Sequence, residues 1–267
     1  MLLCVDVGNS HTTLGVFEGA ALRCELRVST RRGWTRDEVA AALAQALNLA
    51  GLGFDALTDA VVACVVPPAL VPLCEALRQY AQLDPLVVGP GTKTGMPIRY
   101  DPPQDVGADR IVTAVAAHGR YGRAEDGSSR GVVVVDFGTA TTFDVVSPTP
   151  EYLGGAIAPG IGISADALFA RAARLPRVDA QRPASVIGRN TVAAIQSGLV
   201  LGYVGLVEGL IVRIKAEVTW PVWVIATGGF ARTIAVESTA IDEVDDALVL
   251  EGLRDIHGRN RKPEKND

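Results

Sequence analysis

The strongest constraint on the fold is a short pattern that occurs twice, about half the chain apart. In each copy an apolar run ends in an aspartate, a glycine-containing turn follows, and a second strand-like run begins. An ungapped offset of 130 residues aligns five pairs: Val5 with Val135, Asp6 with Asp136, Gly8 with Gly138, Thr12 with Thr142 and Val16 with Val146. Two glycine-containing hairpins can match by chance, but the matched positions here are acidic, glycine and hydroxyl residues. The pattern therefore favours an internal duplication.

The rest of the chain predicts an α/β protein, because strands alternate with amphipathic helices. One helix is expected to begin after Thr35, where Thr35 and Glu38 have capping-box spacing. The expected strands are 2–7, 12–17, 22–28, 60–65, 85–88, 131–136, 141–147 and a run from Val222 into Thr227-Gly228-Gly229, and the expected helices are about 36–50, 69–80, 105–117 and 164–174. Segments 118–130 and 154–162 are expected to be loops. We place the domain boundary in the first of them, which gives domains 1–120 and 121–267.

Composition excludes several classes of function. The 25 basic and 30 acidic residues give a net charge of −5, which disfavours a nucleic-acid partner. The apolar stretch Ala60–Cys74, taken as the longest without charge, is interrupted by prolines, and the N-terminus lacks a basic flank, so neither a membrane span nor a signal peptide is predicted. The four cysteines form no CxxC pair, which favours reduced thiols and a cytoplasmic location.

The repeated turns have the chemistry of phosphate sites. An aspartate that ends a buried strand can present its carboxylate to hydrated Mg²⁺, while the following turn offers backbone N–H groups and hydroxyls to phosphate oxygens. Asp6–Ser10 and Asp136–Thr139 both have this arrangement. Two such turns on opposite sides of an interdomain cleft would hold the β- and γ-phosphates of ATP. The Gly228-Gly229 turn would let a flat adenine or ribose lie against the backbone.

Other nucleotide and metal motifs are missing from the sequence. No GxxxxGK[ST] occurs, the glycines of 154–162 lack GxGxxG spacing, and there is no GxSxG. Three scattered histidines, His11, His118 and His257, give no support to a zinc site. His11 lies in the first turn, whereas the other two are expected at helix ends, where a cation is favourable.

Asp109 and Arg110 have two readings of equal weight on the residues alone. In the structural reading, Asp109 complements the dipole of a helix N-terminus and Arg110 makes a surface ion pair. In the functional reading, Asp109 accepts the proton of a substrate hydroxyl and Arg110 binds an anionic substrate.

These landmarks together resemble type III pantothenate kinases over nearly the full chain. The matching segments are DVGNSHTTLGVF (6–17), YDPPQDVGADR (100–110), DFGTATTFD (136–144), GGAIAPG (154–160), GRNT (188–191), QSG (196–198) and TGGFA (227–231). The resemblance implies two duplicated ribonuclease-H-like domains of the actin-like ATPase class, with mixed sheets and an interdomain ATP cleft. It also implies phosphorylation of pantothenate to 4'-phosphopantothenate, the first step of coenzyme A synthesis, by a cytoplasmic homodimer.

The resemblance assigns roles to individual residues. Asp109 would be the catalytic proton acceptor, Asp6 would bind Mg²⁺ through water, and Asp136 would bind the monovalent cation, K⁺ or ammonium. ATP would contact Asp6, Val7, Gly8, Asn9, Ser10, His11, Thr12, Thr13 and Thr139. The glycine turn after the strand from Val222 adds Gly228 and Gly229 as candidate ATP contacts. Pantothenate would contact Tyr100, Gly107, Ala108, Asp109, Arg110 and Thr191.

Three positions depart from the family pattern without removing a catalytic group. Ser10 replaces the threonine of DxGNT, Arg189 replaces the lysine of GKNT, and His11 replaces a frequent asparagine. Two alternatives share the same fold: a non-catalytic ATP-binding regulator and a phosphohydrolase that uses water as the acceptor. The presence of both Asp109 and Asp136 argues against the regulator.

Overall fold

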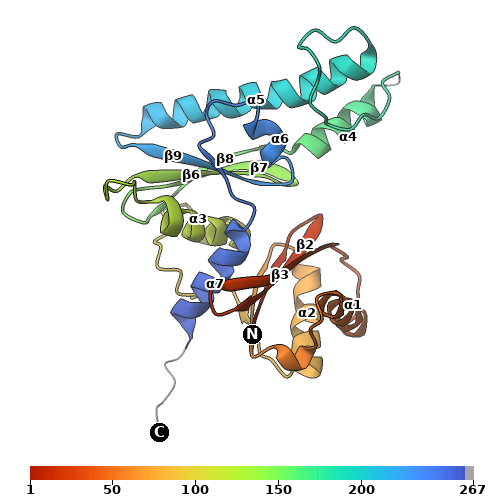
Figure 1. Cartoon of the computed structure of the whole chain (residues 1–267), viewed down its shortest axis with the longest axis vertical. Helices are drawn as coiled ribbons and strands as arrows, with labels where there is room; N and C mark the ends of the chain where they lie inside the picture. Colours follow the sequence, from red (N-terminus) through yellow and green to blue (C-terminus); the bar gives the residue numbers. More distant parts are fainter. Residues whose placement is uncertain (173, 262–267) are drawn as a thin grey trace. The chain divides into compact units, whose positions relative to one another are not determined.

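The computed structural model describes residues 1–172 and 174–261, which form two compact units (Figure 1). The first unit contains Met1–Ala116 together with the segment that begins at Leu248, and the second contains Ala117–Ala247. The division differs from the predicted domains 1–120 and 121–267, because the last helix packs with the first unit. That helix follows the whole second unit in the chain, so only tertiary contacts assign it.

The first unit is built on a five-stranded mixed sheet in the order β3-β2-β1-β4-β5. Its strands are β1 (Leu2–Val7), β2 (His11–Glu18), β3 (Ala21–Ser29), β4 (Asp59–Cys64) and β5 (Leu86–Val87). Strand β1 is antiparallel to β2 and parallel to β4. This pairing buries β1 in the centre of the sheet, as its continuous apolar sequence requires.

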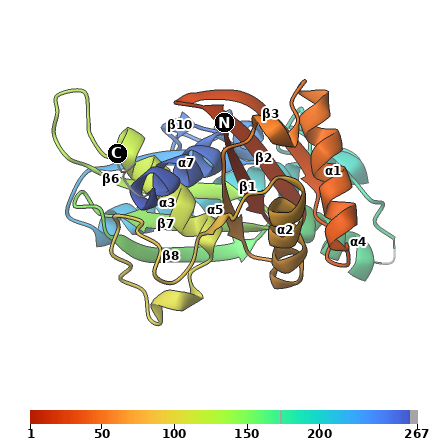
Figure 2. The same ribbon diagram turned by 90° about the horizontal axis from the view of Figure 1, so that it is seen from below.

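Helices cover both faces of the first sheet (Figure 2). Helices α1 (Arg36–Leu49) and α2 (Pro67–Tyr80) lie on one face, where Leu43 and Leu77 pack against Val5 in the core. Helix α7 (Leu248–Asn260) packs against the other face, and Leu250 lies where a side chain on Gly15 would be. Short helices η1 (Phe54–Ala56) and η2 (Pro103–Asp105) lie in the connections.

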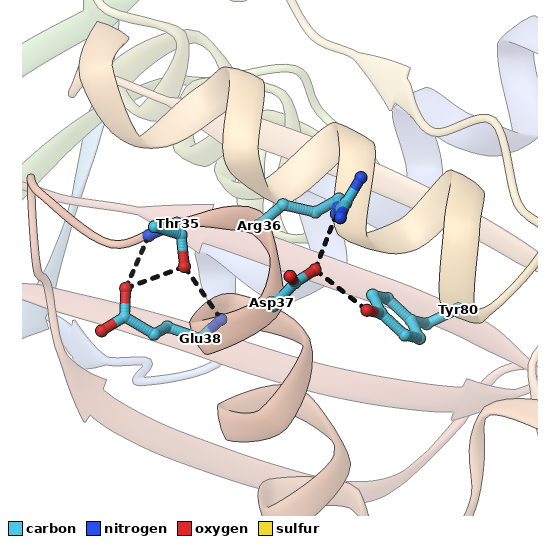
Figure 3. A network of polar contacts seen from close by, with 5 residues as sticks. All are labelled: Thr35, Arg36, Asp37, Glu38 and Tyr80. Atoms are coloured by element: carbon cyan, nitrogen blue, oxygen red, sulfur yellow. Dashed lines mark hydrogen bonds and ion pairs between the residues drawn. The ribbon is translucent and has the colours of Figure 1, made fainter.

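The start of α1 confirms the predicted capping box (Figure 3). The Glu38 backbone N–H donates to the Thr35 hydroxyl, and the Thr35 N–H donates to the Glu38 carboxylate. Next to it, Asp37 accepts hydrogen bonds from Arg36 and from the Tyr80 hydroxyl of α2, which lower the pKa of Asp37. The capping box fixes where the helix begins and contributes roughly 1 kcal/mol. The contacts of Asp37, which is exposed, add little stability.

The second unit repeats the sheet, in the order β10-β9-β6-β7-β8. Its strands are β6 (Gly131–Phe137), β7 (Ala140–Val146), β8 (Tyr152–Pro159), β9 (Val222–Gly228) and β10 (Glu243–Val244), and its helices are α4 (Ile161–Arg171), α5 (Thr191–Glu217) and α6 (Ala231–Ala235). The central β6 is antiparallel to β7 and parallel to β9. Helix α5 runs along the sheet (Figure 1), where Val200 and Val207 share a core with Val133 and Val135.

The strand registers confirm the duplication and correct its alignment. Asp6 pairs with Thr13, whereas Asp136 pairs with Thr142. The second turn is therefore one residue shorter, and beyond it Thr13, not Thr12, is the counterpart of Thr142. An ungapped alignment cannot show this shift, because it lies inside the turn.

Two predicted loops are partly regular structure. Helix α3 (Ala108–Tyr121) starts later than the predicted 105 and continues past 117, because Arg120 and Tyr121 both bind the buried Asp245 at 3.0 and 2.9 Å. Residues 154–159 belong to β8 instead of a loop. A Cβ on Gly155 would lie 1.6 Å from the Phe143 oxygen, so the glycine serves close strand pairing. The helix expected at 164–174 is α4, which begins earlier, at Ile161.

Helix α5 is long and apolar enough to cross a membrane, and the uncharged run 191–207 within it exceeds the stretch Ala60–Cys74. The core helix of a soluble protein meets the same criteria. Side chains buried along α5 include Val200, Val204, Val207 and Ile211, a helical spacing that faces the sheet. Its length and composition therefore do not place the chain in a membrane.

Candidate active site

The first candidate phosphate turn connects β1 to β2. Asp6 is half-buried near the end of β1, and the Gly8 N–H closes the turn by donating to the His11 oxygen at 3.0 Å. Asn9, Ser10 and His11 are exposed at its tip. The sequence-predicted arrangement of a strand-end carboxylate beside an exposed polar turn is therefore present.

The two threonines that follow this turn face opposite sides of the sheet. Thr13 pairs with Asp6 and shares its face, whereas Thr12 pairs with Val7 on the other face. The Thr12 hydroxyl lies 2.9 Å from the Thr30 hydroxyl, just beyond β3. The Thr13 side chain thus lies on the same face of the sheet as the Asp6 carboxylate, whereas the Thr12 hydroxyl bonds to Thr30 on the opposite face.

The His11 ring is exposed and lies beside Arg27 of β3, with 3.4 Å between the Arg27 Nη2 and the His11 Nδ1. Partial burial lowers the pKa of His11, and the Arg27 guanidinium lowers it further. The imidazole is therefore biased toward its neutral form, in which one ring nitrogen donates a hydrogen bond and the other accepts one.

The second turn, between β6 and β7, presents Asp136, Gly138 and Thr139. The Gly138 N–H donates to the Ala140 oxygen at 3.0 Å, and Gly138 and Thr139 are exposed. The Thr139 oxygen in turn accepts the Gly160 N–H at 3.1 Å. The beginning of α4 is thus attached to this turn.

The structure brings Gly228 and Gly229 to the second turn. They end β9, which runs parallel to β6, so both strand ends lie at one edge of the sheet. Gly228 has φ +91°, and a Cβ there would lie 2.4 Å from Asp136 Oδ1. The Gly229 N–H donates to the Phe137 oxygen at 3.1 Å. Position 228 therefore needs glycine, and a ligand at this edge meets backbone instead of side chains.

Asp109 and its neighbours form a second cluster in the first unit. Asp109 lies in the first turn of α3, where its Oδ1 accepts the Arg110 backbone N–H at 2.8 Å. A Cβ on Gly107 would lie 2.4 Å from the same oxygen and 3.5 Å from the Val65 side chain. The Val65 N–H bonds to the Val7 oxygen at 3.1 Å, so this loop and the first turn share one edge of the sheet. Ala108 and Tyr100 are half-buried nearby in the sequence.

Thr191 belongs to the second unit. It begins α5, where the Asn190 side chain caps the helix by accepting the Ala193 N–H at 2.8 Å. A hollow of about 840 Å³ surrounds this helix end and has apolar walls from α4 and α5. Its polar groups come from Ser164, Arg189, Asn190, Thr191 and Tyr203.

Two residues that support the turns, Thr30 and Gly160, were assigned no role from the sequence. Each follows the third strand of its sheet, and each donates its backbone N–H to the last residue of a phosphate turn, Ser10 or Thr139. The duplicated turn motif would have indicated these two residues only if the alignment of the two halves had been extended to β3 and β8, which they follow.

The described residues contain no cluster of side chains that could enclose a metal ion. Among residues 1–172 and 174–261, no group of three or more His, Cys, Asp or Glu could hold a metal ion. One carboxylate beside a phosphate-binding turn fits Mg²⁺, which keeps waters and takes substrate phosphates as its other ligands. Asp6 and Asp136 each satisfy that requirement at a strand end.

Two α/β units with the same strand order, each with an aspartate near the end of its central strand, define a class of duplicated α/β proteins with mixed sheets. Solved structures with this fold include a Baf family protein from Campylobacter jejuni (19% identity, TM-score 0.59, covering 97% of this chain and 98% of that one). Another is the ethanolamine utilization protein EutJ from Carboxydothermus hydrogenoformans (14% identity, TM-score 0.52, covering 95% and 88%).

Within this class the chain belongs to the type III pantothenate kinase family, whose profile matches residues 2–213. The type III pantothenate kinase of Anaeromyxobacter dehalogenans strain 2CP-C is 54% identical over 98% of this chain and 100% of the relative. That of Myxococcus xanthus is 53% identical over 97% of this chain and 99% of the relative. The family resemblance seen in the sequence is thereby confirmed.

Proposed function

We propose that this chain is an ATP-dependent kinase that phosphorylates the primary hydroxyl of pantothenate to give 4'-phosphopantothenate. The observation that carries the proposal is similarity to type III pantothenate kinases over almost the whole length, with both aspartate turns in equivalent strand positions. Similarity of fold alone would not identify the molecule that accepts the phosphate, because one fold serves many reactions.

We assign the role of proton acceptor to Asp109. As the pantothenate hydroxyl oxygen attacks the γ-phosphorus, its proton passes to the Asp109 carboxylate, the bond to the β,γ-bridging oxygen breaks, and ADP leaves. The Arg110 N–H holds one carboxylate oxygen at 2.8 Å, which fixes the orientation of the group. The N-terminus of α3 favours the anionic carboxylate before the transfer.

The two turns have the chemistry to bind ATP. Backbone N–H groups and the Ser10 hydroxyl of the first turn would contact phosphate oxygens, and Asp6 would hold Mg²⁺ through water. Mg²⁺ supplies charge neutralisation on the phosphates. In the second unit, Thr139 would contact ATP, and the exposed backbone at Gly229 suits the flat part of the nucleotide.

We also propose that the enzyme binds a monovalent cation, K⁺ or ammonium. Asp136 is the ligand that the family resemblance assigns. Its half-buried carboxylate beside Gly228, where no side chain fits, supports that assignment. Such ions bind oxygen ligands, and backbone carbonyls surround the adjoining turn.

Pantothenate would contact Tyr100, Gly107, Ala108 and Arg110 in the first unit and Thr191 in the second. Arg110 suits the carboxylate of pantothenate because a guanidinium binds carboxylates through two parallel hydrogen bonds. Thr191 lines the hollow at the start of α5, where polar groups stand among apolar walls, the composition typical of small-molecule sites.

A homodimer in the cytoplasm completes the proposal. Large apolar side chains are exposed around α4 and α5: Ile163, Leu168, Phe169, Val186, Ile187, Val192 and Val212. Exposed apolar side chains that form one patch are typical of an association surface. All four cysteines are free thiols, as expected in a reducing compartment.

The first experiment measures ADP release by the purified protein with Mg²⁺-ATP, with and without pantothenate, in K⁺ and in Na⁺ buffer. We expect turnover that requires pantothenate and is faster in K⁺. Asp109→Asn should lose nearly all turnover while retaining ATP binding. ADP release without pantothenate would instead indicate a phosphohydrolase, and ATP binding without turnover would indicate a regulatory protein.

A further inference from the structure

Thr30, the residue after β3, makes three hydrogen bonds, two to the first phosphate turn and one to Thr12 of β2. Its hydroxyl donates to the Gly8 oxygen at 2.7 Å, and its backbone N–H donates to the Ser10 oxygen at 3.0 Å. Because the hydroxyl has one proton and gives it to Gly8, the contact of 2.9 Å with Thr12 is donated by Thr12. Thr30 is thus joined to the beginning and end of the turn and to the strand beyond it.

These bonds decide which way the turn peptides face. A trans peptide is planar, and its C=O and N–H point in opposite directions. When Thr30 draws the Gly8 oxygen toward itself, the Asn9 N–H of the same peptide points to the opposite side. An anion needs N–H groups and is repelled by carbonyl oxygens, so this orientation prepares the turn for phosphate.

The second unit shows that the sheet does not require a side chain here. The register places Gly160 of that unit in the position of Thr30, since His11 pairs with Ser29 and Ala140 pairs with Pro159. A Cβ on Gly160 would lie 2.3 Å from the Thr139 oxygen. The backbone bond is common to both turns, but the hydroxyl clamp exists only in the first.

We infer that Thr30 is a positioning residue for ATP, which holds the Gly8–Asn9 peptide in the phosphate-binding orientation through its hydroxyl. The inference rests on the proposed function in that the anion is the phosphate chain of ATP. Thr30 acts through the turn, so its loss should weaken nucleotide binding without changing the affinity for pantothenate.

Thr30→Val is the decisive variant, and the surroundings allow it to fold. Valine has nearly the shape of threonine, with a methyl group in place of the hydroxyl. Thr30 lines an apolar cavity of about 60 Å³ together with Val7, Val28 and Trp34, which gives room for that methyl group. Thr30→Ser keeps the hydroxyl and loses only the methyl. Thr92→Val is the matched control, because Thr92 is also half-buried in the first unit and its hydroxyl also holds a turn, by accepting the Gly89 N–H at 3.1 Å.

The test compares the three variants with the full-length parent chain. Isothermal calorimetry measures Kd for the Mg²⁺ complex of the β,γ-imido analogue of ATP, and steady-state assays measure KM for ATP and for pantothenate. We expect Thr30→Val to raise Kd and the KM for ATP about three- to tenfold, the effect of one lost hydrogen bond. Thr30→Ser and Thr92→Val should stay within about twofold, as should every KM for pantothenate.

Two results would overturn the inference: a Thr30→Val protein that binds the analogue as tightly as the parent chain, or a Thr30→Ser protein weakened as much as Thr30→Val. Binding by calorimetry does not depend on turnover. If the parent chain binds the analogue but transfers no phosphate to pantothenate, the proposed function fails while the same titrations still decide the role of Thr30.

Discussion

The two phosphate turns have the same strand frame but are supported in different ways. In the first unit, the turn is held by the Thr30 side chain, which belongs to the connection after an edge strand. In the second, the corresponding residue is Gly160, whose missing side chain lets the backbone lie against Gly138 and Thr139 and lead directly into α4. A duplicated frame thus preserves strand register, while each copy has its own contacts at the ligand edge.

The largest expected effects come from exchanging the carboxylates of the two turns for amides. Asp6→Asn should reduce kcat by about 10²- to 10³-fold by weakening the hold on Mg²⁺, yet retain the rate difference between K⁺ and Na⁺. Asp136→Asn should abolish that difference. Steady-state rates in both salts, across a Mg²⁺ series, check the pair. The distinction between the turns fails if Asp6→Asn loses the K⁺ response or Asp136→Asn keeps it.

Adding one methyl group at Gly160, which supports the second turn, and one at Gly8, within the first turn, should have different effects on stability. Gly160→Ala places a Cβ within 2.6 Å of two backbone oxygens, so we expect a loss of about 2–3 kcal/mol in the free energy of unfolding. Gly8→Ala meets only the His11 oxygen, at 3.0 Å, and should cost less than about 1 kcal/mol because alanine also restricts the unfolded chain. Urea unfolding followed by circular dichroism gives both values, and similar losses would contradict this difference.

A substitution at Tyr203 shows whether α5 also stabilises the segment that supports the second turn. Its hydroxyl donates to the Pro159 oxygen at 2.8 Å and lies 2.6 Å from the Ser164 hydroxyl, which joins α5 to the start of α4. Tyr203→Phe should lower the free energy of unfolding by about 1 kcal/mol. Tyr80→Phe is the control, because its exposed bond to Asp37 should contribute only about 0.3 kcal/mol. Equal urea midpoints for the two variants would show that Tyr203 gives no special support.

The smallest expected effect concerns His11, whose counterpart in the second turn is Ala140. Because the pKa of His11 is lowered in the folded state, the unfolded chain binds more protons as the pH falls below about 6.5, the ordinary value. Folding therefore loses stability in that window, and His11→Ala should remove this small part of the acid sensitivity.

An NMR titration of the His11 ring measures the same property directly. Arg27→Gln should move the pKa of His11 upward, toward its ordinary value, because it removes the guanidinium charge beside the ring. An unchanged pKa in that variant would assign the whole shift to burial. Melting temperatures of the parent chain and His11→Ala at pH 7.5 and 5.5 complete the comparison.

Local patterns in the sequence determined much of the fold. A continuous β-branched run predicted the buried strand β6, Thr35 and Glu38 marked the start of α1, and Asp6 and Asp136 marked the two turns. Such features depend on residues close together in the chain, where side-chain periodicity, capping and turn chemistry act. The same reasoning missed β8, because glycines that permit close strand pairing look like loop residues.

Only the tertiary structure decided the features that join distant segments. Thr30 contacts the turn at Gly8 through β3, α7 returns to the first unit after the whole second unit, and Asp245 extends α3 by binding Arg120 and Tyr121. The one-residue difference between the two turns was also visible only in the strand pairing. The physical reason is that these contacts form once the sheets bring distant residues together, so no local propensity encodes them.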